Sequence, residues 1–416
     1  MATAMLLAGI PVLASASSST AVPGTTSLAA VACADSTTCE AVGTAGAVGG
    51  GVTIHNGTPG TVWSDSDTSQ LTGVACGSAG SCEAIASPAG VVAIDGGSPG
   101  SLQAIAGVSW LSGLACATAS ACIAVGRGSS GEGAVVPINN GVPGTPAAVP
   151  GVTQLYGVAC PGASSCIAVG YLSSSSGEVG QVVPITAMSP SAPQTIAGTI
   201  VPEGIACSSA TACIAVGNDM SGHGIVLPIT AGAPGAPVQV ADTSNLAAVA
   251  CPSGDTCVAV GDSSSGGVAV PITGITPGNV LVLSASENLS GISCASDAVC
   301  EAVGISSNIG AITGEAVSFS PSADNSNPGA QASPSGAPSA APSTPSASPS
   351  PGLVHPSPRA NAPRRKHNLD GSQKVAHPDP GAGFPVPLLV VVLVGLAAAS
   401  WGGSWLIRRR RGARAG

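Results

Sequence analysis

The stretch LSGLACATASACIAVG, from Leu111 to Gly126, decides the fold of this chain. It contains two short apolar runs, Leu111–Cys116 and Cys122–Gly126, separated by five small residues. Such a pattern predicts two antiparallel strands joined by a tight turn. Each cysteine lies where its strand meets the turn, so the hairpin would place Cys116 and Cys122 opposite each other.

The same pattern occurs seven times along the chain. Successive copies begin 43, 40, 44, 47, 44 and 43 residues apart, and in every copy five residues separate the two cysteines. A period of this length indicates a structural repeat. All fourteen cysteines belong to it, as the pairs Cys33/Cys39, Cys76/Cys82, Cys116/Cys122, Cys160/Cys166, Cys207/Cys213, Cys251/Cys257 and Cys294/Cys300.

Each repeat contains two further strand-like segments. The third strand, Val135–Ile138 in the example, carries a proline, which lacks a backbone donor and suits an outer, less fully paired position. A turn ending in Pro-Gly, such as Pro143-Gly144, is expected to lead to a fourth, more variable strand. Runs such as Cys122–Gly126 are apolar on both faces, which suits a sheet held between two neighbours.

Four short strands in about forty to forty-five residues are typical of a propeller blade. We therefore predict an all-β fold, a seven-bladed β-propeller over residues 17–319. A β-solenoid is the alternative, although its coils are usually shorter and need no closure. The seventh repeat ends at a third strand near Glu315–Phe319, whereas Thr20–Gly24 resembles the fourth-strand segment Ala147–Gly151. We expect residues near 18–24 to complete the last blade.

The paired cysteines are predicted to form one disulfide in each blade. Opposed cysteines in a hairpin lie within disulfide reach, and an even number in an exported chain favours oxidation. Each bridge would close a short loop and contribute about 2 kcal/mol. Free buried thiols and a metal site are the alternatives, but a metal needs more ligands than one isolated pair supplies. We predict no metal and no cofactor.

The N-terminal end of the chain predicts export. Residues 1–16 contain an apolar run, Ala4–Leu13, followed by the A-x-A sequence Ala14–Ala16, as in a signal peptide. A buried strand is the alternative. After the propeller, residues 320–383 are rich in Pro, Ser and Ala and predict a disordered linker.

A transmembrane helix is predicted at residues 384–407. Leu388–Ile407 is uncharged and would be about 30 Å long as a helix, which matches a hydrocarbon core. Trp401 and Trp405 suit the membrane interface, and a buried helix is the alternative. The positive-inside rule places the tail, 408–416, in the cytoplasm and the propeller outside the cell membrane. Four consecutive arginines open that tail: Arg408, Arg409, Arg410 and Arg411.

The net charge of −9 is distributed unevenly. Between Ser17 and Phe319 there are seventeen Asp and Glu residues and one basic residue, Arg127. An acidic domain of this kind repels polyphosphate, so nucleic acid is excluded as a partner.

The repeat L-x-x-V-x-C-x5-C-x-A-V-G, as in Leu155–Gly170 and Leu289–Gly304, resembles that of secreted actinobacterial β-propellers. Those repeats are distantly similar to sialidase-type and photosystem-assembly-factor-type propeller repeats. The resemblance covers about residues 18–319 and implies the fold but no function, because propellers of this kind serve binding, scaffolding and catalysis. The Asp-box S-x-D-x-G-x-T-W of sialidase-like blades is missing, which weakens an enzymatic interpretation.

Candidate ligand-binding residues lie in the loops between second and third strands, which emerge on one face of a propeller and vary most here. These residues are Arg127, Glu132, Tyr171, Glu178, Asp219, His223 and Asp262. Solvated loops with incidental charges are the alternative. The two propeller histidines, His55 and His223, stand in no recognisable motif, so we predict no catalytic residue.

The sequence leaves two classes of function. The first is a non-catalytic binding or scaffold module at the bacterial cell surface, with a protein, peptide or cell-wall glycan on its loop face. The second is a surface enzyme acting on glycans, a hydrolase or lyase, beside a role in envelope assembly or sensing. Carboxylates with a basic residue in the central channel would favour the enzyme, whereas a channel lined by Gly, Ser and Ala would favour the binder.

Overall fold

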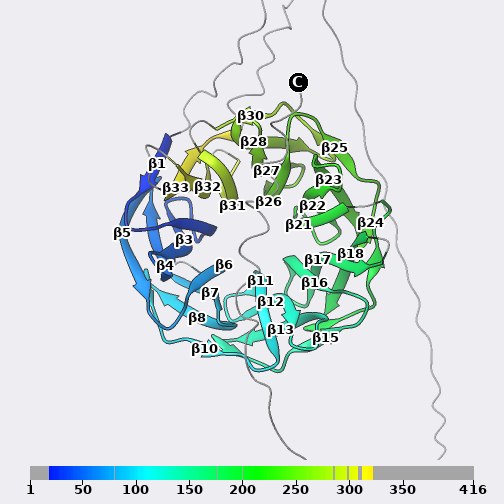
Figure 1. Cartoon of the computed structure of the whole chain (residues 1–416), viewed down its shortest axis with the longest axis horizontal. Helices are drawn as coiled ribbons and strands as arrows, with labels where there is room; N and C mark the ends of the chain where they lie inside the picture. The colour runs from blue at the N-terminus through cyan, green and yellow to red at the C-terminus, as the bar shows by residue number, and fades with distance from the viewer. Residues whose placement is uncertain are drawn as a thin grey trace, which may run out of the picture. The chain divides into compact units, whose positions relative to one another are not determined.

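Seven antiparallel sheets, one for each cysteine pair, form the blades of a closed β-propeller (Figure 1). The structure is a computed structural model that describes residues 18–78, 80–175, 177–198, 200–283, 286–297, 299–307 and 312–321. The predicted all-β, seven-bladed fold is confirmed. Among these residues no helix has the length and apolar character needed to cross a membrane. The predicted signal peptide, transmembrane helix and basic tail lie outside them, as does the predicted linker beyond its first two residues.

The strands of each blade follow one another from the channel outward. Blade 1 consists of β2 (Ser27–Cys33), β3 (Thr38–Ala45), β4 (Val48–His55) and β5 (Thr58–Asp65). Blade 2 consists of β6 (Gln70–Ser78), β7 (Ser81–Ser87), β8 (Gly90–Asp95), β9 (Ser98–Pro99) and β10 (Gln103–Ala104). Blade 3 consists of β11 (Val108–Thr118), β12 (Ala121–Gly128), β13 (Gly133–Asn139), β14 (Val142–Pro143) and β15 (Ala147–Val149). Blade 4 consists of β16 (Gln154–Gly162), β17 (Ser165–Ser174), β18 (Gly177–Thr186), β19 (Ser189–Pro190) and β20 (Gln194–Thr195).

The remaining blades repeat this order. Blade 5 consists of β21 (Ile200–Cys207), β22 (Ala212–Asp219), β23 (Gly224–Thr230), β24 (Ala233–Pro234) and β25 (Val238–Val240). Blade 6 consists of β26 (Asn245–Ser253), β27 (Thr256–Ser263), β28 (Gly266–Thr273), β29 (Thr276–Pro277) and β30 (Leu281–Val282). Blade 7 consists of β31 (Ser286–Ser296), β32 (Val299–Ser306), β33 (Thr313–Phe319) and, from the other end of the propeller chain, β1 (Ser18–Val22).

Strand β1 closes the ring as predicted. It pairs antiparallel with β33 along its whole length, from Ser18 opposite Ser318 to Val22 opposite Gly314. The side chain of Val22 is buried in the core between blades 7 and 1. The last blade is therefore built from both ends of the propeller sequence, and β1 pairs with the outer edge of β33.

All seven predicted disulfides are present, and no cysteine is free among the described residues. They lie at the end of the inner hairpins away from the loops that carry the predicted ligand residues. The bridges are Cys33–Cys39, Cys76–Cys82, Cys116–Cys122, Cys160–Cys166, Cys207–Cys213, Cys251–Cys257 and Cys294–Cys300. The alternatives of free thiols and of a metal held by the pairs are therefore wrong for these fourteen residues.

The two cysteines of a bridge differ in burial, a difference that the spacing in the sequence did not predict. The first lies at the end of the inner strand and is partly exposed. The second lies on the next strand, which is paired on both sides, and its side chain packs into the core shared with the preceding blade. These second cysteines are structural core residues and not part of a ligand-binding surface: Cys39, Cys82, Cys122, Cys166, Cys213, Cys257 and Cys300.

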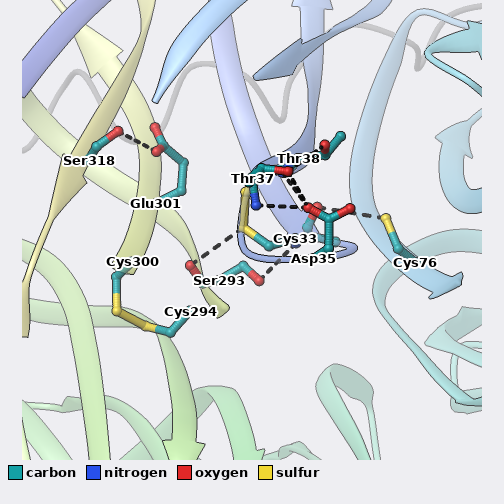
Figure 2. Close-up of a disulfide and its surroundings, with 12 residues drawn as sticks. Cys33, Asp35, Thr37, Thr38, Cys76, Ser293, Cys294, Cys300, Glu301 and Ser318 are labelled. Carbon is teal, nitrogen blue, oxygen red and sulfur yellow. Dashed lines mark hydrogen bonds between the residues drawn. A yellow bond between two sulfur atoms is a disulfide. The ribbon is translucent and has the colours of Figure 1, made fainter. Parts of the chain in front are cut away.

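Figure 2 shows the surroundings of the first bridge. The backbone N–H of Cys33 donates to the hydroxyl of Ser293 in blade 7, 3.0 Å away. In the adjoining turn Asp35 accepts hydrogen bonds from the backbone N–H groups of Thr37 and Thr38. The bridge end of one inner strand is thus hydrogen-bonded to the blade beside it.

The apolar faces of each second strand pack against different neighbours. In β12, Ile123 and Val125 belong to the core shared with blade 4, whereas Cys122 and Ala124 belong to the core shared with blade 2. Seven such clusters, one between each pair of blades, form the interior. Val, Ile and Leu side chains form most of each cluster, together with alanines and the second cysteine of a bridge, so the core contains few aromatic rings.

The fourth strand departs from the prediction. In blade 3, β14 pairs with Ile138 and Asn139, and β15 pairs with Gly133 to Val135, so the strand is broken opposite Pro137. The predicted turn ending in Pro-Gly is wrong, because the turn is made by Asn140 and Gly141 at φ of 49° and 75°. Residues of a type I′ turn need such angles. The Pro-Gly pair follows the turn, and Gly144 N–H donates to the carbonyl oxygen of Pro137 at 2.7 Å.

One irregularity recurs in every inner strand. The register with the second strand slips by one residue directly after the position of Leu111, which leaves Ser112 as an extra residue in β11. Such a β-bulge re-aims a side chain. The equivalent residues, called here the bulge residues, are Ala29, Thr72, Ser112, Tyr156, Glu203, Ala247 and Ser290, and all of them line the central channel.

Candidate functional site at the channel mouth

The central channel is narrow because small residues let the inner strands approach one another. Three residues from each inner strand line it, and it encloses about 180 Å³. A Cβ atom on Gly157 would lie 2.7 Å from the carbonyl oxygen of Glu203 in the next blade. The middle residue of each triplet is accordingly Gly or Ala: Ala30, Gly73, Gly113, Gly157, Gly204, Ala248 and Gly291.

Two adjacent bulge residues differ from the rest. Five are Ala, Ser or Thr, whereas blade 4 has Tyr156 and blade 5 has Glu203. The channel wall therefore combines one aromatic ring and one carboxylate on a background of small and aliphatic residues. None of the described residues that line it is basic.

The ring of Tyr156 stacks on a residue of the neighbouring strand. Tyr171, at the loop end of β17, lies with its ring centroid 5.6 Å from that of Tyr156, and the two planes are 20° apart. Offset stacking of this kind fixes both rings in place. Burial raises the pKa of the Tyr156 hydroxyl, and the nearby charges of Glu203 and Glu178 act in the same direction.

Two asparagines hold the carboxylate of Glu203. Asn245 Nδ2 donates to Glu203 Oε2 at 3.1 Å, and Asn218 Nδ2 donates to Glu203 Oε1 at 3.4 Å. Asn218 Nδ2 also donates to Asn245 Oδ1 at 3.2 Å, which closes a triangle of three side chains from blades 5 and 6. The carboxylate is thus oriented before any ligand arrives.

The electrostatic surroundings make Glu203 easy to protonate. Burial raises its pKa to about 7, the hydrogen bond from Asn245 opposes this rise, and the negative charge of Asp262 adds to it. Asp262 is the cross-strand neighbour of Asn245. We call Tyr156, Tyr171, Glu203, Asn218, Asn245 and Asp262 the mouth cluster.

The opposite part of the same mouth is chemically simpler. The cross-strand pairs that correspond to Asn245 and Asp262 are Ser27 with Thr44 in blade 1 and Gln70 with Ser87 in blade 2. Their side chains carry hydroxyls and one amide but no charge. The mouth over blades 1 and 2 therefore differs from the mouth over blades 3 to 6, where the equivalent pairs include charged, amide and aromatic side chains.

The structure divides the predicted ligand-face residues into two groups. Tyr171 and Asp262 belong to the mouth cluster, and Arg127 occupies the equivalent position in blade 3, opposite Trp110. The other four lie elsewhere, in or directly beside the connections between second and third strands: Glu132, Glu178, Asp219 and His223.

Asp219 and His223 make contacts within their own loop. Asp219 Oδ1 accepts the backbone N–H groups of Ser221 and His223, at 2.9 and 3.0 Å. The ring nitrogen His223 Nδ1 lies 3.4 Å from Asp219 Oδ2. These contacts shape a turn, and Gln239 donates to the remaining oxygen of Asp219 at 2.9 Å.

Four mouth residues escaped the sequence analysis: Tyr156, Glu203, Asn218 and Asn245. A comparison of the seven repeats with one another would have identified two of them, Tyr156 and Glu203. The recurrent leucine is replaced by Pro202 in the fifth repeat. The residue after this position is Ala, Thr or Ser in five repeats, and Tyr156 and Glu203 are the exceptions. The bulge directs this residue into the channel. The alternation of side chains expected for a regular strand does not predict that orientation.

A second set of carboxylates belongs to the blade interfaces. The residue after the second cysteine is Ile or Val in blades 3 to 6 but Glu40, Glu83 and Glu301 in blades 1, 2 and 7. Glu40 accepts hydrogen bonds from Thr53 Oγ1 at 2.8 Å and from Trp63 Nε1 at 3.0 Å. Glu301 accepts one from Ser318 (Figure 2). Burial raises the pKa of Glu301 to about 7, and the Ser318 hydroxyl opposes the rise.

Within the part of the chain that the structure describes, no three His, Cys, Asp or Glu side chains gather in a way that could hold a metal ion. The mouth cluster itself offers two carboxylates, two amides and two phenol rings.

Comparisons with known proteins show a similarity in fold only. No protein-family profile and no curated protein matches this chain. Among solved structures it is similar to one described as YCF48 bound to D1 peptide, with a TM-score of 0.50 and 13% sequence identity. The match covers 75% of this chain and 99% of the other. The two proteins share the propeller architecture, and at this identity the likeness defines the class of fold alone.

Proposed function

We propose that this protein is a non-catalytic, membrane-anchored binding module that holds a protein or peptide at the channel mouth, outside a bacterial cell of actinobacterial type. The observation that carries the binding function is the mouth cluster. Aromatic, amide and carboxylate groups lie together over blades 4 to 6 of a rigid scaffold, and rigid aromatic anchors flanked by oriented polar groups favour recognition.

Several features support the extracellular setting. Seven disulfides suit an oxidising compartment, because intracellular thiols are normally kept reduced. The sequences of residues 1–16 and 384–407 suit a signal peptide and a transmembrane helix, with a linker over 320–383 and a cytoplasmic tail over 408–416. In this arrangement the linker holds the propeller away from the membrane.

A peptide or protein is the ligand that we favour. The solved propeller with a similar fold is described as bound to a peptide. In addition, the channel is smaller than the roughly 300–1,000 Å³ of most small-molecule pockets. One side chain of a larger partner fits such a volume.

The binding function can be tested on peptide arrays of defined sequence, probed with the full chain in detergent micelles. We expect a subset of peptides to bind, with Tyr156→Ala reducing that binding at least tenfold. Asp35→Asn, in a disulfide turn at the other end of the inner strands, is the matched control and should bind like the wild type. Absence of any binding peptide, or equal loss in both variants, would contradict the proposal.

Glycan cleavage is the second candidate, and one observation favours it. Glu203 and Asp262 are two carboxylates at one mouth, with a glutamate pKa near 7, as a general acid requires. One observation speaks against it. Both oxygens of Glu203 accept hydrogen bonds from amide donors, which favours the ionised carboxylate over the protonated carboxylic acid. Release of reducing sugar from purified cell-wall glycan by the wild type, and its absence in Glu203→Gln, would favour the enzyme.

A further inference from the structure

We propose that the mouth cluster recognises one basic side chain, a lysine or arginine of the partner, with the cation against Glu203 and the aliphatic stem against the tyrosines. The inference rests on the proposed function and specifies the chemistry of its ligand. Four observations support it: the negative charge of the propeller, the unused hydrogen-bond acceptor positions of Glu203, the rings of Tyr156 and Tyr171, and the volume of the channel.

The negative charge of the propeller favours a cationic ligand. Between Ser17 and Phe319 seventeen acidic residues face one basic residue. Arg127 is in blade 3, so blade 4 separates it from Glu203 in blade 5. Among the residues that the structure describes, Glu203 is also the only one with a carboxylate that lines the channel, and channel walls concentrate the field of such a charge.

The carboxylate of Glu203 retains acceptor capacity. An ionised carboxylate offers about four acceptor positions, two on each oxygen. Asn218 and Asn245 each supply one hydrogen bond, to different oxygens. The remaining positions can accept charge-assisted hydrogen bonds from an ammonium or guanidinium group, which are stronger than bonds between neutral groups.

The two tyrosines provide a surface for the rest of such a side chain. Tyr156 and Glu203 are the bulge residues of adjacent blades, and the stack with Tyr171 fixes the ring of Tyr156. Ring faces attract cations, and the methylene stems of lysine and arginine pack on apolar surface while the charged group stays polar. A chamber of about 180 Å³ accommodates one such side chain and excludes a helix.

The test uses two fluorescent peptides, Ac-Gly-Ser-Lys-Ser-Gly-NH2 and the same peptide with norleucine in place of lysine. Norleucine keeps the stem and removes the charge. Fluorescence anisotropy with the full chain in detergent micelles should show at least tenfold tighter binding of the lysine peptide. The Glu203→Gln variant should reduce that ratio to about one, because it keeps the size of the side chain and removes its charge.

A control separates local recognition from general attraction. Glu132→Gln removes the same charge from a loop of blade 3 on the same face, outside the mouth cluster, and should keep the ratio within about twofold of the wild type. A wild-type ratio near one, or an equal effect of the two variants, would overturn the inference. If both peptides bind alike and Tyr156→Ala abolishes both, the proposed function stands and the inference falls. If no peptide binds, both fall.

Discussion

The hydroxyl of Ser19 on β1 donates a hydrogen bond to Glu315 Oε1 on β33, across a sequence separation of 296 residues. Glu315 is 1% exposed, and burial raises its pKa while the Ser19 hydroxyl opposes the rise. The bond accompanies the backbone pairing of the two strands. The two ends of the propeller are therefore joined by one strand pair inside a single blade.

Weakening this closing strand should destabilise the entire ring. Val22→Ala removes two methyl groups from a fully buried side chain of β1, and we expect it to lower the free energy of unfolding by about 2 kcal/mol. Chemical denaturation with the disulfides intact measures this. Thr20→Ala, which truncates an exposed side chain of the same strand, is the control. Equal denaturation midpoints for Val22→Ala and the wild type would mean that β1 contributes nothing to closure.

The disulfide pattern predicts a mass measurement. The protein treated with a thiol-alkylating reagent under denaturing conditions should gain no label before reduction and fourteen labels after it, since every cysteine lies in a bridge. Intact mass spectrometry distinguishes these states. Labels on the unreduced protein would show incomplete bridging, and they would weaken the argument for an oxidising compartment.

Glu301 should make stability depend on pH. Its pKa is about 7 in the folded protein because it is buried, against about 4.3 for an unfolded glutamate. The folded state then binds more protons between these values, so this residue lowers stability as pH rises from about 4 to 7. Glu301→Gln should stabilise the protein more at pH 8 than at pH 5, by up to about 3 kcal/mol.

Thermal unfolding of Glu301→Gln and the wild type at the two pH values tests this. Glu132→Gln, which changes the same charge in a surface loop, should show no such difference. A Glu301→Gln effect of the same size at both pH values would mean that the residue titrates normally in the fold.

Binding of the lysine peptide should weaken in acid. Glu203 has a pKa of about 7, and lysine keeps its charge throughout this range, so acidification removes the negative partner alone. Besides Glu203, the titratable groups of the cluster are Asp262, Tyr156 and Tyr171. We expect the dissociation constant to rise at least tenfold from pH 8 to pH 5.5, measured by anisotropy.

Two variants check the origin of this pH dependence. Glu203→Gln should give a nearly flat profile over the same range. Asp262→Asn should move the midpoint to lower pH, because the negative charge of Asp262 contributes to the raised pKa of Glu203. An unchanged midpoint in Asp262→Asn together with a steep profile in Glu203→Gln would assign the titration to another group.

The proposed membrane anchor predicts where shortened chains are found. The full chain should sediment with membranes and resist carbonate extraction, whereas a chain ending at Pro380 should be released to the medium. The two differ by the apolar segment and the arginines that follow it. Release of the full chain, or membrane retention of the shortened one, would contradict the anchor.

Sequence by itself determined the blade number, the disulfides and the closing strand. Each depends on local information: the spacing of two cysteines in one hairpin, the period of the repeat, and the match between Thr20–Gly24 and Ala147–Gly151. Closure follows as well, because the last repeat lacks one strand and the segment before the first repeat supplies it. The break in the fourth strand was missed, since it depends on hydrogen bonds such as that from Gly144 to Pro137.

Only the tertiary structure decided the site. Glu203 and Asn245 are 42 residues apart and in different blades, and they meet because the inner strands of neighbouring blades converge on one axis. The bulge then directs one residue of each inner strand into the channel, which no alternation of polar and apolar residues predicts. Sequence supplied Tyr171 and Asp262 as loop residues, but the fold alone placed them beside a carboxylate held by two asparagines.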